Sequence, residues 1–205
     1  MPPRLALLWI AAASWGATLP QSDYVSAKHK LNAIQHYRLP PGSSVTFTPR
    51  EIDAWARVEI PKEIPRGFRE PHVQLGEGTA SGRALVDFLQ MRQARGQKPG
   101  WVMSRMLEGE RPLLMAVRLR SSGGWCTIDL TRVEISGVAA EGSVLDFLIR
   151  TFFLPLYPNA KIGQPFELGF NMERLQIHPS GVVVRIGNRR TDETKRLAPP
   201  SYGRR

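Results

Sequence analysis

The side chains best suited to chemistry are four histidines: His29, His36, His72 and His178. None of them has the spacing of a metalloprotease motif. His29 and His36 are seven residues apart, so on a helix they would share a face that could hold a metal ion. We favour a solvated helix face over that metal site.

Cys126 is the only cysteine, which excludes an intrachain disulfide and a two-thiolate zinc site. It alternates with Ile128 and Leu130, so we expect a buried, unreactive thiol. No serine stands in a nucleophile elbow, and the glycines of residues 76–82 lack the helix and the acid of a dinucleotide site. No catalytic partner can be assigned to Asp87, Asp129, Glu134 or Glu141. The sequence therefore predicts a protein that is not an enzyme and uses no metal or cofactor.

Charge and composition narrow the class of partner. The 205 residues carry a net charge of +10, and 42% of them are hydrophobic, which is sufficient for a core. The basic residues are not interleaved with aromatic ones as in a single-strand RNA platform, so nucleic acid is not an expected partner. Contact with an anionic membrane surface and a merely soluble basic surface both stay open.

The first residues have the pattern of an export signal. Arg4 precedes an apolar stretch at residues 5–13, and small residues at 14 and 16 suit cleavage after Gly16. We therefore expect residues 1–16 to be a signal peptide and the protein to be exported, periplasmic or extracellular. An uncleaved anchor is the lesser alternative.

Two helices are predicted next. Residues 17–41 form an amphipathic N-terminal segment, with Tyr24, Ala27, Leu31 and Ile34 on one face. We expect this face to pack on the domain; a membrane-surface helix and a mobile arm are the alternatives. Residues 48–51 read Thr-Pro-Arg-Glu, a capping box that opens a second helix, with extended chain expected at residues 58–65.

Alternating apolar residues predict antiparallel strands over most of the remaining chain. These are residues 73–87 broken at a glycine turn, a hairpin at 113–135 and a hairpin at 175–186. The apolar phase slips from Leu130 to Val133, which predicts a bulge near Thr131 and Arg132 that bends the sheet. Residues 188–205 are basic and lack a core pattern, so a disordered tail is expected.

Residues 143–153 are predicted to form the central, nearly all-apolar helix. Ser143 suits its N-cap, Asp146 and Arg150 form its thin polar stripe, and Pro155 ends it. A helix of this kind must be covered on most sides. It is either a solid core helix or a wall of a cavity for an apolar ligand.

In the order and spacing of these elements, the chain resembles the tubular lipid-binding (TULIP) superfamily, especially small exported LmeA-type phospholipid-binding proteins. The likeness covers residues 22–187: the strand and helix opening at residues 45–55, the paired strands at 73–87, the hairpin at 113–135, the helix at 143 and the closing strands at 166–186. It implies an α+β domain at residues 42–187, in which a strongly curved antiparallel sheet wraps around a long apolar helix.

The resemblance further implies a lipid-binding or lipid-shuttling protein whose ligand is a lipid or another apolar molecule. Its acyl chains would lie between the helix and the sheet. The candidate lining residues are Val144, Leu145, Leu148, Ile149 and Phe152 from the helix and Met115, Val117, Leu119, Ile128 and Leu130 from the sheet. The alternative is a cell-envelope interaction module with a solid core, and an unrecognised hydrolase is the least favoured class.

Overall fold

The computed structural model describes residues 20–64, 66–93, 109–142, 145–146, 149–150 and 162–187. Strands make up 45% and helices 30% of this part, which is therefore mainly β-sheet. The helices are α1 (Pro20–Gln35), α2 (Pro49–Glu63) and α3 (Phe88–Gln93). The strands are β1 (Ser44–Phe47), β2 (Phe68–Gly76), β3 (Thr79–Val86), β4 (Arg111–Ser122), β5 (Trp125–Ile135), β6 (Val138–Ala139), β7 (Phe166–Glu167), β8 (Met172–His178) and β9 (Gly181–Ile186).

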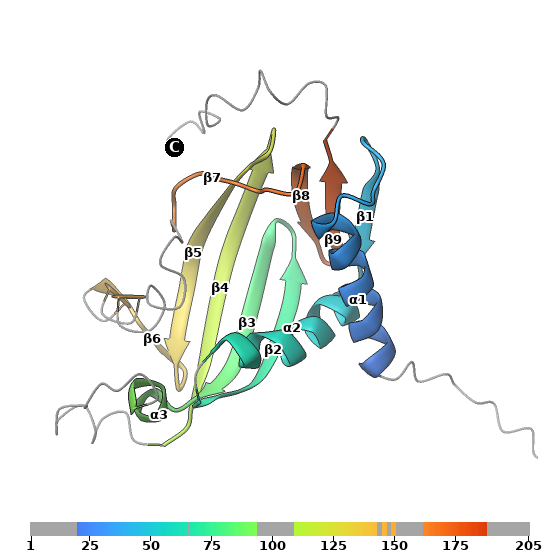
Figure 1. Cartoon of the computed structure of the whole chain (residues 1–205). Coiled ribbons are helices and arrows are strands. Elements are labelled where there is room, and N and C mark those ends of the chain that lie inside the picture. Colours follow the sequence, from blue (N-terminus) through green and yellow to red (C-terminus); the bar gives the residue numbers. More distant parts are fainter. Residues whose placement is uncertain are drawn as a thin grey trace, which may run out of the picture.

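The strands form two antiparallel sheets. The small sheet has the order β1-β9-β8, and the large sheet has the order β2-β3-β4-β5-β6, with β7 also paired to β5. Figure 1 shows the small sheet beside one end of the large sheet, with α1 next to it and α2 running diagonally across β2 and β3. As far as the described strands go, neither sheet closes.

The tips of two hairpins join the large sheet to β8. Gly78 N–H, in the β2–β3 turn, donates to Ile177 O at 2.9 Å, and Gly124 N–H, in the β4–β5 turn, donates to Glu173 O at 2.8 Å. Ser121 Oγ also donates to Leu175 O at 2.6 Å. These bonds satisfy backbone groups at the edge of β8 that would otherwise lack partners.

The predicted capping box opens α2. Thr48 Oγ1 accepts from Glu51 N–H at 3.2 Å, Glu51 Oε2 accepts from Thr48 N–H at 2.7 Å, and Pro49 occupies the first turn. The helix continues to Glu63 through Pro61, so the expectation of extended chain at residues 58–65 was wrong. A proline near the end of a helix removes only one backbone bond, and the packing of α2 outweighs that loss.

The N-terminal helix packs on the domain, which is the alternative that the sequence analysis favoured. Ala27 and Ile34 of α1 are 0% and 4% exposed, and Leu31 packs beside them. They belong to the first core, whose buried residues are Ala27, Ile34, Phe47, Ile177, Val182, Val184 and Ile186. The second core, at the other end of the large sheet, consists of Ala84, Val86, Phe88 and Met91, with Ile64, Phe68, Leu113 and Ile135 packed against it.

The predicted bulge is present in β5. Ala116 pairs with Arg132 and Val117 with Leu130, which leaves Thr131 as the extra residue. Thr131 Oγ1 donates to Ala116 O at 3.0 Å. Because of this insertion, Ile128 and Leu130 share a face with Val133 and Ile135, despite the slip in phase.

The predicted α+β fold, with a curved sheet wrapped around a long apolar helix, was wrong. No long apolar helix occurs in the described ranges, and the large sheet is covered by α2, whose outer side is polar. Of residues 143–153 only Leu145, Asp146, Ile149 and Arg150 are described, with both charged residues exposed. An apolar run shows that burial is favourable but not where it takes place. In this fold α1 and α2 contribute to the first core, and α3 contributes to the second. The predicted signal peptide at residues 1–16 and the tail at 188–205 lie outside the described residues.

Candidate functional site

The structure brings the sheet half of the predicted lining together on one face. Cross-strand partners point to the same side of a sheet, and the register pairs Val117 with Leu130 and Leu119 with Ile128. Met115, two residues before Val117, lies on that side too. All five side chains are half-buried.

Of the helix half of the predicted lining, the structure describes only Leu145 and Ile149. Leu145 and Ile149 are half-buried but belong to neither core. Val144, Leu148 and Phe152 lie outside the described residues.

Four of the strand residues form what we call the apolar face: Met115, Val117, Ile128 and Leu130. Leu119 packs against the first core, while Leu113 and Ile135 pack against the second. The four residues of the apolar face belong to neither core in the described part of the chain, and neither does their neighbour Val133, which is 7% exposed. A contiguous half-exposed apolar patch of this kind is typical of a binding surface.

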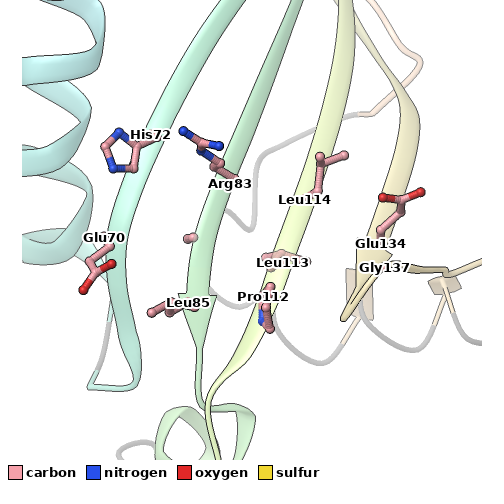
Figure 2. Close-up of a pocket in the computed structure, with 10 residues that line it drawn as sticks. Glu70, His72, Arg83, Leu85, Pro112, Leu113, Leu114, Glu134 and Gly137 are labelled. Carbon is pink, nitrogen blue, oxygen red and sulfur yellow. The ribbon is translucent and has the colours of Figure 1, made fainter.

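The opposite side of the same sheet has an open hollow of about 460 Å³, which we call the outer hollow. Figure 2 shows His72, Arg83, Leu114 and Glu134 side by side across neighbouring strands, as the register requires. Its lining residues are Glu70, His72, Arg83, Ala84, Leu85, Pro112, Leu113, Leu114, Glu134 and Gly137.

Two irregular backbone segments frame the outer hollow. The register of β2 shifts between Arg69 and His72, and Glu70 there has a φ of 52°, in the left-handed region. On the other side, Ser136 (φ 53°) and Gly137 (φ 79°) make the tight β5–β6 turn. A non-glycine residue held at positive φ stores strain, and strained residues of this kind concentrate at functional sites.

Charges around the outer hollow are unevenly paired. Asp53 Oδ1 lies 3.4 Å from His72 Nδ1 and accepts from Val73 N–H at 2.9 Å, which joins α2 to the edge of β2. Arg132 Nε donates to Glu134 Oε1 at 2.8 Å. Arg83, which is exposed, has no ion-pair partner among the residues that the structure describes.

Sequence reasoning missed the outer hollow, although a signal was present. Leu85 and Leu114 stand in the polar phase of their strands: Leu85 lies between Ala84 and Val86 of the second core, and Leu114 follows Leu113, which packs against that core. Apolar residues on both phases of a strand indicate that both faces of the sheet contact apolar groups. The paired strands alone do not reveal a hollow, because its rim depends on the two irregular segments.

The reactive residues do not assemble a catalytic site in the described part of the chain. Cys126 is 1% exposed, as predicted, and burial raises the pKa of its thiol to about 11. His29 and His36 are both exposed, whereas His72 and His178 lie near Asp53 and Glu77 in separate places. Within the described ranges, no group of three potential ligands could hold a metal ion.

Asp87, one of the acids considered for catalysis, has a capping role instead. Its Oδ1 accepts from Gln90 N–H at 2.9 Å at the start of α3. The acid therefore stabilises the first turn of a helix.

Comparison with known proteins assigns the chain to no family, because no family model and no curated protein sequence matches it. None of the helices in the described part is long and apolar enough to cross a membrane. Acidic and basic side chains almost balance there, so most of the net charge of +10 belongs to other segments, including residues 94–108 and 188–205.

Proposed function

We propose that this chain is a non-enzymatic, extracytoplasmic lipid-binding or lipid-shuttling protein that holds an acyl chain against the apolar face. One observation carries the proposal: Met115, Val117, Ile128 and Leu130 share one side of the sheet, yet belong to neither core. Each methylene that such a surface removes from water contributes about 0.8 kcal/mol. The export pattern of residues 1–16 supports an extracytoplasmic location.

The likeness to the TULIP superfamily stays a prediction from the order of elements. The proposal does not depend on it, because the apolar face belongs to β4 and β5 and not to a central helix.

The test measures lipid uptake from phosphatidylcholine vesicles by native mass spectrometry after detergent-free purification. Val117→Asn should abolish uptake while the protein stays folded, because an amide on the apolar face opposes burial of an acyl chain. Arg118→Asn is the matched control, since Arg118 is the next residue and points to the opposite side. Phosphatidylcholine has no net charge, so the loss of one arginine charge should not matter.

The variant Val117→Thr conserves the shape of the side chain, so it provides the test if the Val117→Asn protein does not fold. Reduced uptake by a stably folded Val117→Thr protein supports the proposal. Unchanged uptake by folded variants of Val117, or no uptake by the unmodified protein, overturns it.

The distribution of charge favours a second candidate, a cell-envelope interaction module with a solid core. The described residues are nearly neutral, so the basic segments outside them are suited to an anionic partner. Deleting residues 188–205 should weaken binding to phosphatidylglycerol vesicles at low salt and have little effect at high salt. Equal binding by the deleted and full chains would exclude this role for the tail.

A further inference from the structure

We propose that the outer hollow is a second ligand site, which binds a small organic anion with one negative charge and a short apolar body. This site lies on the opposite side of the large sheet from the apolar face, so the two can be tested separately.

The positive end of the site is Arg83. Its guanidinium is exposed and unpaired within the described residues, whereas Arg69, Arg120 and Arg132 on the large sheet each pair with an acid. His72 stands directly across from Arg83 in the register and on the same side, with its Nδ1 turned to Asp53 Oδ1. A guanidinium with free donors beside apolar surface suits a carboxylate, which it can bind through two hydrogen bonds.

The floor of the site is apolar. Leu85 and Pro112 are cross-strand partners, and Leu114 lies in the next row beside Arg83. Figure 2 shows Leu114 between Arg83 and Glu134, with Leu85 and Pro112 below them in this view. A ligand whose anionic group meets Arg83 can therefore lay a short hydrocarbon chain over this floor.

The far rim limits the charge of the ligand. Glu134 lies across Leu114 from Arg83, and Glu70 stands on the β2 side. These two carboxylates would repel a second negative charge, so the site should prefer a monoanion to a dianion.

The experiment compares three probes of equal chain length with the full chain: octanoate, octan-1-ol and octylammonium. Chemical shifts of β3 and β4 amides are followed at neutral pH and low ionic strength. We expect saturable binding of octanoate and much weaker binding of the other two. Arg83→Gln should weaken octanoate binding about tenfold, because it removes a charge-assisted hydrogen bond.

Arg118→Gln is the matched control. Arg118 is exposed on the same side of the sheet, also has no ion pair among the described residues, and does not line the hollow. It should leave octanoate affinity within about twofold of that of the unmodified protein. A larger loss in Arg118→Gln than in Arg83→Gln would overturn the assignment of Arg83.

Three other results would overturn the proposal. They are octan-1-ol binding as tightly as octanoate, an Arg83→Gln protein with unchanged octanoate affinity, and loss of octanoate binding in the folded Val117→Asn protein. The last result would place octanoate on the apolar face, so failure of the second site is distinguishable from failure of the proposed function.

Discussion

The end of the molecule that contains α1, α2 and the small sheet differs from the β4–β5 half of the large sheet. In the first region Val182 and Val184 of β9 are 8% and 4% exposed, because α1 packs over the small sheet. In the second region Val117 lies on a strand of the same alternating kind, but it is only half-buried. Alternation therefore predicts which side of a strand is apolar, but not whether another element covers that side.

Polar contacts follow the same division. Glu51, 4% exposed, joins the N-terminus of α2 to α1, since it accepts from Lys30 Nζ at 2.7 Å and from Ser26 Oγ. The ion pairs on the outer side of β4 and β5, such as Arg120 with Asp129, are exposed to solvent and contribute little. The first region is therefore suited to stability, whereas in the second Met115, Val117, Ile128 and Leu130 stay half-buried.

The largest expected effect tests this division by truncating one side chain in each region. Phe47→Ala should lower the free energy of unfolding by about 3–5 kcal/mol, because Phe47 is 2% exposed in the first core. Val117→Ala should cost less than about 1 kcal/mol, since its side chain already contacts solvent. Urea denaturation of both variants measures the difference, and equal losses would show that the two regions are packed alike.

A smaller effect is expected at Glu51. Burial raises the pKa of its carboxyl, but hydrogen bonds from Lys30, Ser26 and Thr48 N–H together lower the pKa below its ordinary value of 4.5. The lowered pKa stabilises the folded state at neutral pH, and this contribution is lost as pH falls through the folded-state pKa. Glu51→Gln should cost about 1–3 kcal/mol at neutral pH.

The pH profile supplies the control for Glu51. The loss caused by Glu51→Gln should shrink as the pH falls below 4.5 and through the lower folded-state pKa, because the carboxyl binds a proton first in the unfolded state and then in the folded state. Thermal unfolding across pH 3–7 measures this, and a loss that does not change with pH would mean that the charge of Glu51 does not stabilise the fold.

The smallest effect is expected where the two sheets meet at the surface. His178 Nδ1 lies 2.9 Å from Glu77 Oε1, with side chains 39% and 75% exposed. His178→Gln should change the free energy of unfolding by no more than about 0.5 kcal/mol, because exposed ion pairs are weak. A loss as large as that of Glu51→Gln would show that the two sheets depend on this pair for their attachment.

Local chemistry explains the parts of the fold that could be predicted. Thr48, Pro49 and Glu51 interact within one helical turn, so the start of α2 follows from neighbours in sequence. The hairpin of β4 and β5 and its bulge at Thr131 follow from the phase of the apolar residues. The continuation of α2 through Pro61 was missed, because packing over the whole helix outweighs one lost hydrogen bond.

Of the candidate lining, the shared side of the strand residues could be predicted from the sequence, whereas the contact of residues 143–153 with them stays a prediction. The period of two places Met115, Val117, Leu119, Ile128 and Leu130 on one side, whatever the rest of the chain does. A prediction that residues 143–153 lie against these strand residues requires knowledge of a contact between segments that are far apart in the sequence. An apolar run does not specify such a contact, because hydrophobic attraction has no direction.

The sequence by itself determined the strand faces, the helix cap, the bulge and the buried thiol, because each depends on backbone geometry or on the preferences of nearby residues. Only the tertiary structure decided that α1 and α2 fill the first core, that the apolar face stays half-exposed, and that Arg83 and Leu114 share a hollow with Glu134. These outcomes depend on which elements, far apart in the chain, pack on each surface and exclude water from it. That choice depends on the contacts of the whole molecule and not on any one segment.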